Sequence, residues 1–465
     1  MESQPASAFG LKDEDFETAP LSIGSTHEDT SNSERFVRRN KGHVYYSPRR
    51  KAWIRYDGQR WERDDGKEVI GRAKETAKSI YQEAATLNDE EAIKRGRWAE
   101  RSLNRARVEA MTELAKPAMV VDDELFDAND STVNCGNGTL NQHNGEFHRH
   151  RKEDFLTKLA AVDYDPTAEC PRWQAFLEQT FQSNQPLIEY VQRVAGYFLT
   201  GSITEQVWFM FYGPTASGKS TLVNVLRGML GEYALALPEN YFLITKHENT
   251  DFITANLAGI RLATCIETNE GKRLNVARLK TMTGEDAVSA CFKFENYFEF
   301  KPKCKLVLVT NYPPRVPAGD DALWRRLKVV PFNVTVPEDK RVPGLADKLL
   351  DEEGPGILRW AFDGCRAWQD HGLMEPKAVR EAINAYRTGE DIIADFATEC
   401  LILDANARTP KSEIYLKYTD WCKNEGLRSR SKKFLGLELQ RLGIKPDTDE
   451  RHYRGVRTRQ LGDLD

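Results

Sequence analysis

The stretch Val-Trp-Phe-Met-Phe-Tyr-Gly-Pro-Thr-Ala-Ser-Gly-Lys-Ser-Thr, residues 207–221, decides the fold of this chain. Its first part, Val207–Tyr212, is an uninterrupted apolar run, which is typical of a buried strand in a parallel sheet. The next residues, Gly213–Ser220, fit the pattern G-x-x-x-x-G-K-[ST] and lead into a helical segment, Lys219–Leu230. A strand, a glycine-rich loop and a helix in this order form a phosphate-binding loop. The sequence therefore predicts a P-loop ATPase with an α/β fold and a central sheet.

This loop also predicts how ATP and Mg²⁺ are held. The glycines let backbone N–H groups turn toward the phosphates, and the start of the helix adds a favourable dipole. Lys219 is expected to reach the β- and γ-phosphates, and the Ser220 hydroxyl to ligate Mg²⁺. The nucleotide-binding residues are then Gly213, Pro214, Thr215, Ala216, Ser217, Gly218, Lys219, Ser220 and Thr221.

Three further features supply the catalytic candidates. Glu267 closes a strand candidate, Gly259–Glu267, where a carboxylate would hold Mg²⁺ and activate water. Asn311 follows a second strand candidate, Lys303–Thr310, and would lie at the strand ends, where ligands of such sheets bind. The adjacent Arg325 and Arg326 could reach into a neighbour's ATP site and stabilise transition-state charge. A surface salt-bridge pair is the alternative for these two arginines.

Composition limits the class of protein. The chain of 465 residues is 40% hydrophobic and 29% charged, which indicates a globular protein with room for about three domains. Its net charge of −5 argues against a uniformly basic nucleic-acid coat, although a local channel can still attract DNA. The eight cysteines form no CxxC pair, so we expect reduced thiols in a cytosolic protein. The chain has no signal-peptide pattern and no apolar stretch of about 18 residues, so no membrane contact is expected.

The local composition and patterning of the sequence predict six segments. The first 40 or so residues are rich in Ser, Thr, Asp, Glu and Pro and are expected to form a disordered or loosely attached arm. Short strands follow, with Asp57-Gly58 as a hairpin turn signal. Near the end, two helices and a strand-turn-strand from Ile444 to Val456 have the order of a winged-helix domain. The expected division is an arm at 1–40, an α+β domain at 41–165, a helical collar at 166–205, the ATPase core at 206–340, a helical connector at 341–395 and a winged helix at 396–465.

Several stretches together resemble superfamily-three helicases of the phage and plasmid primase-helicase type, relatives of the poxvirus primase-helicase. These stretches are Tyr190–Gly201, Gly213–Tyr233, Leu279–Asp286, Phe298–Pro302, Leu308–Asn311 and Arg326–Phe332. The resemblance implies a P-loop, AAA+-like helicase core. It also implies that Glu267 is the acidic motif, Asn311 the sensor and Arg326 the arginine finger, with Arg325 as the alternative.

The same resemblance covers the preceding region, where His43 to Trp173 looks like the domain that comes before this helicase core. Three departures stand out. Cys291 replaces an arginine that is frequent in the family, and Thr268 replaces a second acid beside Glu267. About 40 residues precede the resembling region, too few for the primase domain of larger relatives, so we expect no primer synthesis by this chain.

The resemblance also implies DNA contacts. Lys280 and the stretch Ala287–Phe300 match a segment that forms a β-hairpin in the ring's channel, with Lys293 and Phe294 at its tip. A lysine and an aromatic ring there suit a phosphate contact and base stacking, whereas an ordinary surface hairpin is the alternative. The C-terminal candidates for duplex contact are Arg430, Lys432, Lys433 and Arg454. A winged helix that binds protein instead is the alternative for that domain.

 The sequence therefore predicts an ATP-dependent DNA helicase that forms a ring. The ring is expected to be a homo-hexamer that translocates on single-stranded DNA in the replication of a phage, plasmid or other mobile element. Its expected partners are single-stranded and forked DNA and a separate primase or polymerase, in the cytoplasm of a bacterial host. An ATP-switched DNA-binding initiator or scaffold, which oligomerises on DNA without unwinding it, is the alternative.

Overall fold

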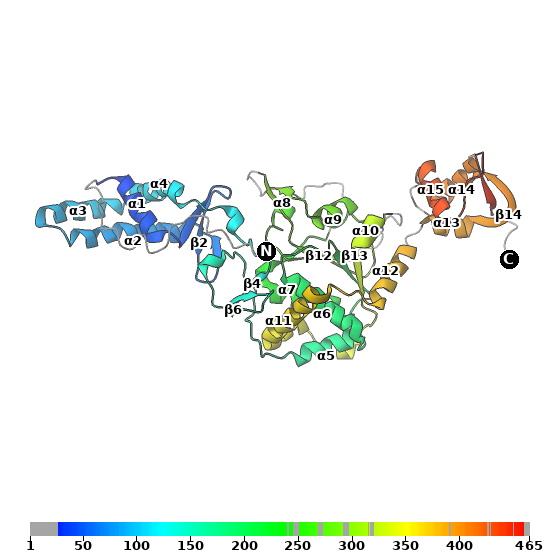
Figure 1. Ribbon diagram of the computed structural model, residues 1–465, viewed down its shortest axis with the longest axis horizontal. Helices are drawn as coiled ribbons and strands as arrows, with labels where there is room; N and C mark the ends of the chain where they lie inside the picture. The colour runs from blue at the N-terminus through cyan, green and yellow to red at the C-terminus, as the bar shows by residue number, and fades with distance from the viewer. Residues whose placement is uncertain are drawn as a thin grey trace. The chain divides into compact units, whose positions relative to one another are not determined.

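The structure is a computed structural model, and it describes most of the chain. The described residues are 27–239, 241–244, 251–267, 273–291, 297–314, 316, 320–389, 392–425, 427, 429–449 and 451–459, without the side chains of Asp251, Glu267 and Gly389. The chain divides into two compact units (Figure 1). The first comprises Met1–Ala128 and His150–Thr157, and the second comprises Asn129–Arg149 and Lys158–Asp465.

The first unit combines helices with a small antiparallel sheet. Its helices are α1 (Asp29–Asn40), α2 (Lys67–Ala84), α3 (Asp89–Ser102) and α4 (Arg105–Ala115), and its strands, in sheet order, are β1 (Val44–Ser47), β2 (Ala52–Tyr56) and β3 (Trp61–Arg63). Helix α1 begins inside the stretch that was expected to be a disordered arm. Its Phe36 is fully buried in a cluster with Val44 and Met111, and this burial holds the helix in place.

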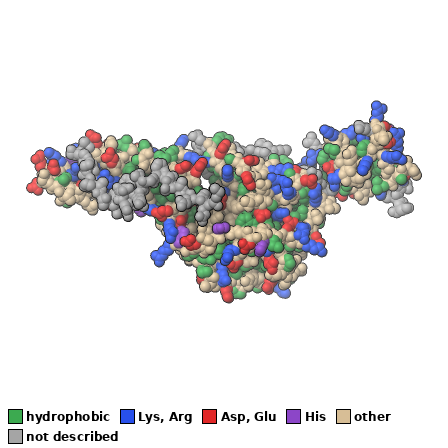
Figure 2. Space-filling model, in the orientation of Figure 1, with side chains coloured by type: hydrophobic (Ala, Val, Ile, Leu, Met, Phe, Trp, Pro, Cys, Tyr) green, Lys and Arg blue, Asp and Glu red, His purple; other side chains and the backbone are tan. Residues whose placement is uncertain are grey.

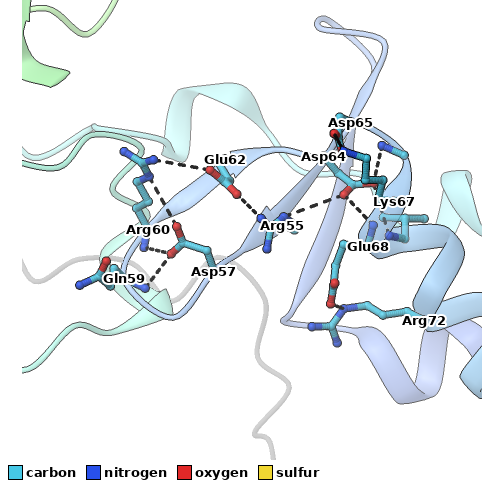
Figure 3. A network of polar contacts seen from close by, with 12 residues as sticks. Arg55, Asp57, Gln59, Arg60, Glu62, Asp64, Asp65, Lys67, Glu68 and Arg72 are labelled. Atoms are coloured by element: carbon cyan, nitrogen blue, oxygen red, sulfur yellow. Dashed lines mark hydrogen bonds and ion pairs between the residues drawn. The ribbon is translucent and has the colours of Figure 1, made fainter.

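Two aspartates fix the chain around β2 and β3 (Figure 3). The hairpin predicted at Asp57-Gly58 is confirmed, because β2 and β3 pair antiparallel around it. The Asp57 carboxylate accepts hydrogen bonds from the backbone of Gln59 at 2.7 Å and of Arg60 at 2.8 Å. Asp64 accepts three backbone N–H groups at the start of α2, which satisfies donors that the helix itself leaves free.

The second unit is built on a five-stranded parallel sheet, as the apolar strand candidates predicted. The sheet order is β13-β7-β12-β9-β8. The strands are β7 (Trp208–Tyr212), β8 (Ala234–Ala236), β9 (Leu262–Glu267), β12 (Lys305–Thr310) and β13 (Leu327–Pro331). In the ladders, Thr310 lies opposite both Tyr212 and Glu267, so these three strands end at the same edge. This arrangement fits a P-loop type of core.

Successive side chains of the sheet enter two different apolar cores, which makes the unit a three-layered sandwich. Phe209 and Phe211 pack with helices α5 (Pro171–Thr180), α6 (Gln185–Leu199), α7 (Lys219–Leu230) and α11 (Leu345–His371). Trp208 and Met210 pack in a second cluster with α9 (Val276–Met282) and α10 (Asp321–Arg326). Two further helices of this unit are α8 (Asp251–Ala255) and α12 (Lys377–Gly389). Helices α5 and α6, expected as a collar or linker, are thus part of the sandwich.

Helices α6 and α11 approach each other closely because both carry glycine at their contact. A Cβ at Gly196 would stand 2.0 Å from the backbone nitrogen of Cys365, and one at Gly364 would stand 2.1 Å from the carbonyl oxygen of Gln192. Neither position has room for a side chain. The close contact fixes α11 against the core that carries the glycine-rich loop.

Smaller elements complete the described residues. An antiparallel sheet of β4 (Thr132–Cys135), β5 (Gly138–Asn141) and β6 (Phe147–His148) belongs to the second unit, whereas the sequence suggested the N-terminal domain for it. Strands β10 (Val288–Ala290) and β11 (Phe298–Phe300) form an antiparallel pair. The 3₁₀ turns are Lys116–Met119, Asp123–Leu125, Lys152–Asp154, Gly231–Tyr233 and Glu338–Lys340. Among the described helices, none combines the length and apolar character that a membrane span needs.

The C-terminal elements surround their own apolar cluster, which includes Phe396, Tyr418 and Val456. In chain order they are α13 (Ile392–Cys400), β14 (Leu401–Pro410), α14 (Lys411–Asn424), α15 (Lys432–Arg441) and β15 (His452–Thr458). The two predicted helices are present. The predicted strand-turn-strand differs, because β15 pairs mainly with β14, and its hairpin arm is a single bridge between Pro446 and Tyr453.

Candidate nucleotide site at the edge of the parallel sheet

The glycine-rich loop lies between β7 and α7, and its shape depends on its two glycines. A Cβ at Gly213 would stand 2.0 Å from the carbonyl oxygen of Phe332. Gly218 has a φ of +89°, and a Cβ there would stand 3.0 Å from the Thr180 hydroxyl oxygen. A side chain at either position would therefore meet a neighbouring segment, and at Gly218 it would also strain the backbone. The backbone N–H of Val336 donates to the Ala216 carbonyl at 2.8 Å and thereby fixes the middle of the loop.

Lys219 is buried inside this loop, with only 5% of its surface exposed. Its Nζ donates to the carbonyl oxygens of Gly213 at 2.8 Å and Pro214 at 2.6 Å, and to the Ser217 hydroxyl at 3.0 Å. All three acceptors are uncharged, and burial lowers the pKa of Lys219 to about 8. The ammonium is thus held in the loop by neutral oxygens, where the phosphates of a nucleotide would favour its charged form.

A cavity of about 190 Å³ opens beside this lysine. Its walls are Thr215–Thr221 of the loop and four residues of the neighbouring strand ends, Ile266, Val309, Thr310 and Asn311. The structure therefore brings Asn311 to the phosphate-binding loop. The Thr310 hydroxyl donates to the Tyr312 carbonyl at 2.6 Å and accepts from the Tyr312 backbone N–H at 3.0 Å, which fixes the turn that carries Asn311. Sequence reasoning missed Thr310 and Ile266, although both directly precede a predicted site residue.

The carboxylate candidate ends the strand on the far side of Asn311. Glu267 is the last residue of β9, and in the ladder it lies opposite Thr310. Its side chain lies outside the described residues, so the structure gives its backbone position alone. That position is the end of a neighbouring strand, where a P-loop ATPase needs an acid.

The residues of this edge fit a nucleoside triphosphate with Mg²⁺. The loop supplies backbone N–H groups and a buried ammonium for the phosphates, and Ser220 is exposed on the first turn of α7. Because Gly218 has no Cβ, the loop can lie close to Thr180 and Phe176 of α5. A hydroxyl from the loop and a carboxylate from a strand end are oxygen ligands of the kind that Mg²⁺ takes.

The two arginines do not line this cavity. Both end helix α10, and they differ in their surroundings. Arg325 is exposed and makes no hydrogen bond or ion pair within the part of the chain that the structure describes. Arg326 donates through Nη1 to the Ala322 carbonyl at 3.2 Å, and its Nε is buried without a hydrogen-bond partner.

The residues predicted to contact DNA fall in three places. Lys280 is in α9, where its Nζ donates to both carboxylate oxygens of Asp320 at 2.8 Å. The two arms of the predicted hairpin are confirmed as β10 and β11, while Lys293 and Phe294 lie outside the described residues.

The C-terminal candidates are all exposed: Arg430, Lys432, Lys433 and Arg454. Figure 2 shows Lys and Arg side chains gathered over the C-terminal elements. The Ser431 hydroxyl accepts from the Phe434 N–H at 3.3 Å and caps α15, so Lys432 and Lys433 occupy the first turn of that helix. Arg454 lies opposite Arg408 in the β14–β15 ladder, and Arg408 is itself paired with Asp447.

Comparison with known proteins adds sequence relatives. Residues 33–182 match the family described as D5 N terminal like, and residues 211–326 match a family of unknown function, DUF5906. A putative helicase, L207/L206 of Acanthamoeba polyphaga mimivirus, is 28% identical over 265 residues, which are 52% of this chain and 27% of that protein. Primase D5 of Fowlpox virus (strain NVSL) is 25% identical over 158 residues, which are 33% of this chain and 20% of that protein.

The chain spans about a quarter of the length of these curated relatives. Among solved structures, the apo C-terminal region of NrS-1 matches with a TM-score of 0.46 and 13% identity, over 87% of this chain and 84% of that one. The two family matches cover the region before the sheet and the core that carries the glycine-rich loop. The chain is a relative of the D5-like primase-helicases.

Proposed function

We propose that this chain is an ATP-driven DNA helicase that works as a ring, with ATP bound between neighbouring copies. One observation carries the proposal: the cavity beside Lys219 gathers the loop and Asn311, and among the described residues no arginine lines it. A P-loop NTPase obtains such an arginine either from its own chain or from a second protein. In a ring, each copy would supply the arginine to the next.

Each residue of the site has a role in this proposal. Lys219 and the loop N–H groups would hold the β- and γ-phosphates, and Asn311 would contact the γ-phosphate and the attacking water. Glu267 would orient and activate that water, because its backbone position lies on the far side of Asn311 from the loop. Mg²⁺, held by Ser220 and Glu267, would neutralise charge on the phosphate oxygens.

Of the two arginines, Arg325 is the better placed to act on a neighbour. An arginine that acts in trans must leave its own subunit and meet phosphate charge. Arg325 is exposed and has no partner to give up among the described residues. Arg326 is partly buried and bound to its own helix. We therefore propose Arg325 as the finger and Arg326 as a residue that supports α10.

The DNA contacts would lie in the channel hairpin and the C-terminal elements. The order helix, strand, helix, helix, strand supports a winged helix for 396–465. Lys432 and Lys433 in the first turn of α15 are unfavourable neighbours of the positive end of the helix dipole. A DNA phosphate at that helix start would offset this cost and would accept from the helix N–H groups as well. We infer that α15 meets the DNA backbone with its N-terminal turn.

A strand-displacement assay on a forked duplex tests the helicase proposal. The wild-type chain is expected to separate the strands in the presence of ATP and Mg²⁺, and Lys219→Ala is expected to bind the fork without separating it. Images of the protein with an ATP analogue should show closed rings. If the wild-type chain shifts the fork but never separates it, the chain is an ATP-switched scaffold and not a helicase. We propose replication of a mobile element as the setting, because the matched relatives are viral proteins named helicase and primase.

A further inference from the structure

Lys280 is placed against an aspartate that caps the arginine-bearing helix. Asp320 precedes α10, and its Oδ1 accepts a hydrogen bond from the backbone N–H of Leu323 at 3.1 Å. Both oxygens of the same carboxylate accept from Lys280 Nζ at 2.8 Å. The exposed fractions of the two side chains are 35% for Lys280 and 24% for Asp320. The lysine charge is therefore already neutralised within the subunit, which weakens its attraction for a DNA phosphate.

The capped helix is short, so its first residue and its last residues move together. Helix α10 has six residues and ends with Arg325 and Arg326. Its middle is held by α12, because Trp324 packs edge-on against Tyr386 with ring centroids 5.1 Å apart. Lys280 holds the cap residue before the helix, while Arg387 of α12 pairs with Asp321, the first residue of the helix. A change at the Asp320 cap would therefore tilt α10 about Trp324 and redirect Arg325.

Helix α9, which carries Lys280, shares an apolar cluster with the paired strands β10 and β11. Leu279 and Met282 of α9 are buried in the same apolar cluster as Leu323 and Trp324. Val288 of β10 and Phe300 of β11 pack against that cluster. Because close-packed groups transmit displacement, movement of the hairpin arms would reach α9 and, through Lys280, the start of α10.

We propose that Lys280 is a positioning residue that acts through Asp320 to set the direction of Arg325. This inference rests on the proposed function, in which Arg325 completes the site of the next copy. It makes hydrolysis in that neighbouring site depend on the hairpin arms of this subunit. Lys280 thereby acts in the coupling of DNA to ATP hydrolysis without touching DNA.

Three single variants and one double variant of the full-length chain test the role of the pair. Asp320→Asn removes the charge but keeps a good N-cap, because Asn and Asp cap helices about equally well. Lys280→Met removes the ammonium and keeps the length of the chain, and Lys280→Arg keeps the charge. DNA-stimulated ATP hydrolysis is measured for each variant and for the double variant Asp320→Asn with Lys280→Met. The salt dependence of single-stranded DNA binding and the melting temperature are measured on the same samples.

The pair predicts a specific pattern. Asp320→Asn and Lys280→Met should each lower the stimulated kcat roughly tenfold, within the usual range of coupling between sites. The KM for ATP should not change, and the double variant should be no slower than either single one. Lys280→Arg should restore most of the rate. The salt dependence of DNA binding should match that of the wild-type chain in all variants.

Four results would overturn the inference. If Lys280→Met lowers the salt slope by about one while Asp320→Asn hydrolyses ATP like the wild type, Lys280 is a phosphate contact. If the two single effects multiply in the double variant, the residues do not act as a pair. If the wild-type chain unwinds DNA and every variant shows the wild-type rate of DNA-stimulated ATP hydrolysis, the positioning role is wrong and the proposed function stands. A wild-type chain that hydrolyses no ATP sinks the proposed function and this inference together.

Discussion

Thr310 of β12 lies directly opposite Glu267 of β9 in the parallel ladder. Asn311, which follows Thr310, and Ile266, which precedes Glu267, both line the cavity beside Lys219, so β9 ends at that cavity. Glu267→Gln should therefore leave ATP binding intact and lower kcat by roughly 100-fold or more, as expected for loss of a general base. Glu178→Gln, at an exposed glutamate of α5, is the matched control. A Glu267→Gln variant with normal turnover would show that another acid activates the water.

The pKa of Lys219 predicts that ATP binding depends on pH. Burial lowers that pKa from 10.5 to about 8, so in the free protein the lysine is largely neutral above about pH 8. Bound phosphates favour the charged form and raise the pKa. Binding should therefore take up a proton above about pH 8, and affinity should fall as pH rises through that value. Calorimetry at about pH 9, in two buffers with different ionisation enthalpies, measures the uptake.

Lys219→Arg is the control for this titration. Arginine stays protonated at every pH of the experiment, so any binding by that variant should occur without proton uptake. Equal heats in the two buffers for the wild-type chain at about pH 9 would contradict the assignment of the proton to Lys219.

The contact between α6 and α11 predicts that replacing glycine by alanine lowers stability inside this contact and raises it at an open position of another helix. Gly196→Ala would place a Cβ 2.0 Å from a backbone nitrogen of α11, so it should destabilise the fold by about 1–3 kcal/mol through overpacking. Gly71→Ala in α2 meets nothing within 4 Å and should stabilise by about 0.5–1 kcal/mol. Thermal and denaturant unfolding measure both. Equal changes in the free energy of unfolding at the two positions would mean that α6 and α11 can move apart at no cost in stability.

Much of the nucleotide site could be predicted because it follows contiguous apolar runs. The strands before the loop, before Glu267 and before Asn311 were all expected from such runs. Strands β8 and β13 were not expected, since β8 has three residues and β13 directly follows a helix without a break. Their places at the two sheet edges depend on long-range pairing, which no local pattern records.

The position of Lys280 could not be read from the sequence for a similar reason. Its partner Asp320 is 40 residues further along the chain, and only the packing of α9 beside α10 joins them. Strand β14 was missed because its sequence, LILDANARTP, is rich in Ala, Asp and Asn, which are depleted in strands. Its pairing with β15, which is distant in the sequence, makes this segment a strand.

The first turn of α15 predicts a trade between stability and DNA binding. Replacing both Lys432 and Lys433 by Ala removes two cations from the positive end of the helix dipole, which should raise stability by about 0.3–1 kcal/mol per residue at low salt. The same change should lower the salt slope of duplex binding by about two. Lys423→Ala, at the last turn of α14, is the matched control and should leave that slope unchanged. An unchanged slope for the double variant would remove α15 from the DNA interface.

The exposed Arg325 predicts that two inactive variants restore activity when mixed. Arg325→Ala keeps an intact Lys219, and Lys219→Ala keeps an intact arginine, so each alone should hydrolyse ATP at a small fraction of the wild-type rate. In mixed rings, some interfaces join the intact loop of one copy to the intact arginine of the next. The mixture should therefore recover part of the wild-type rate, measured after co-assembly at a fixed total concentration. Mixing Arg326→Ala with Lys219→Ala should recover less, because Arg326 is bound to its own helix and its loss disturbs α10 within the subunit. No recovery in the Arg325 mixture would mean that Arg325 does not act across the interface.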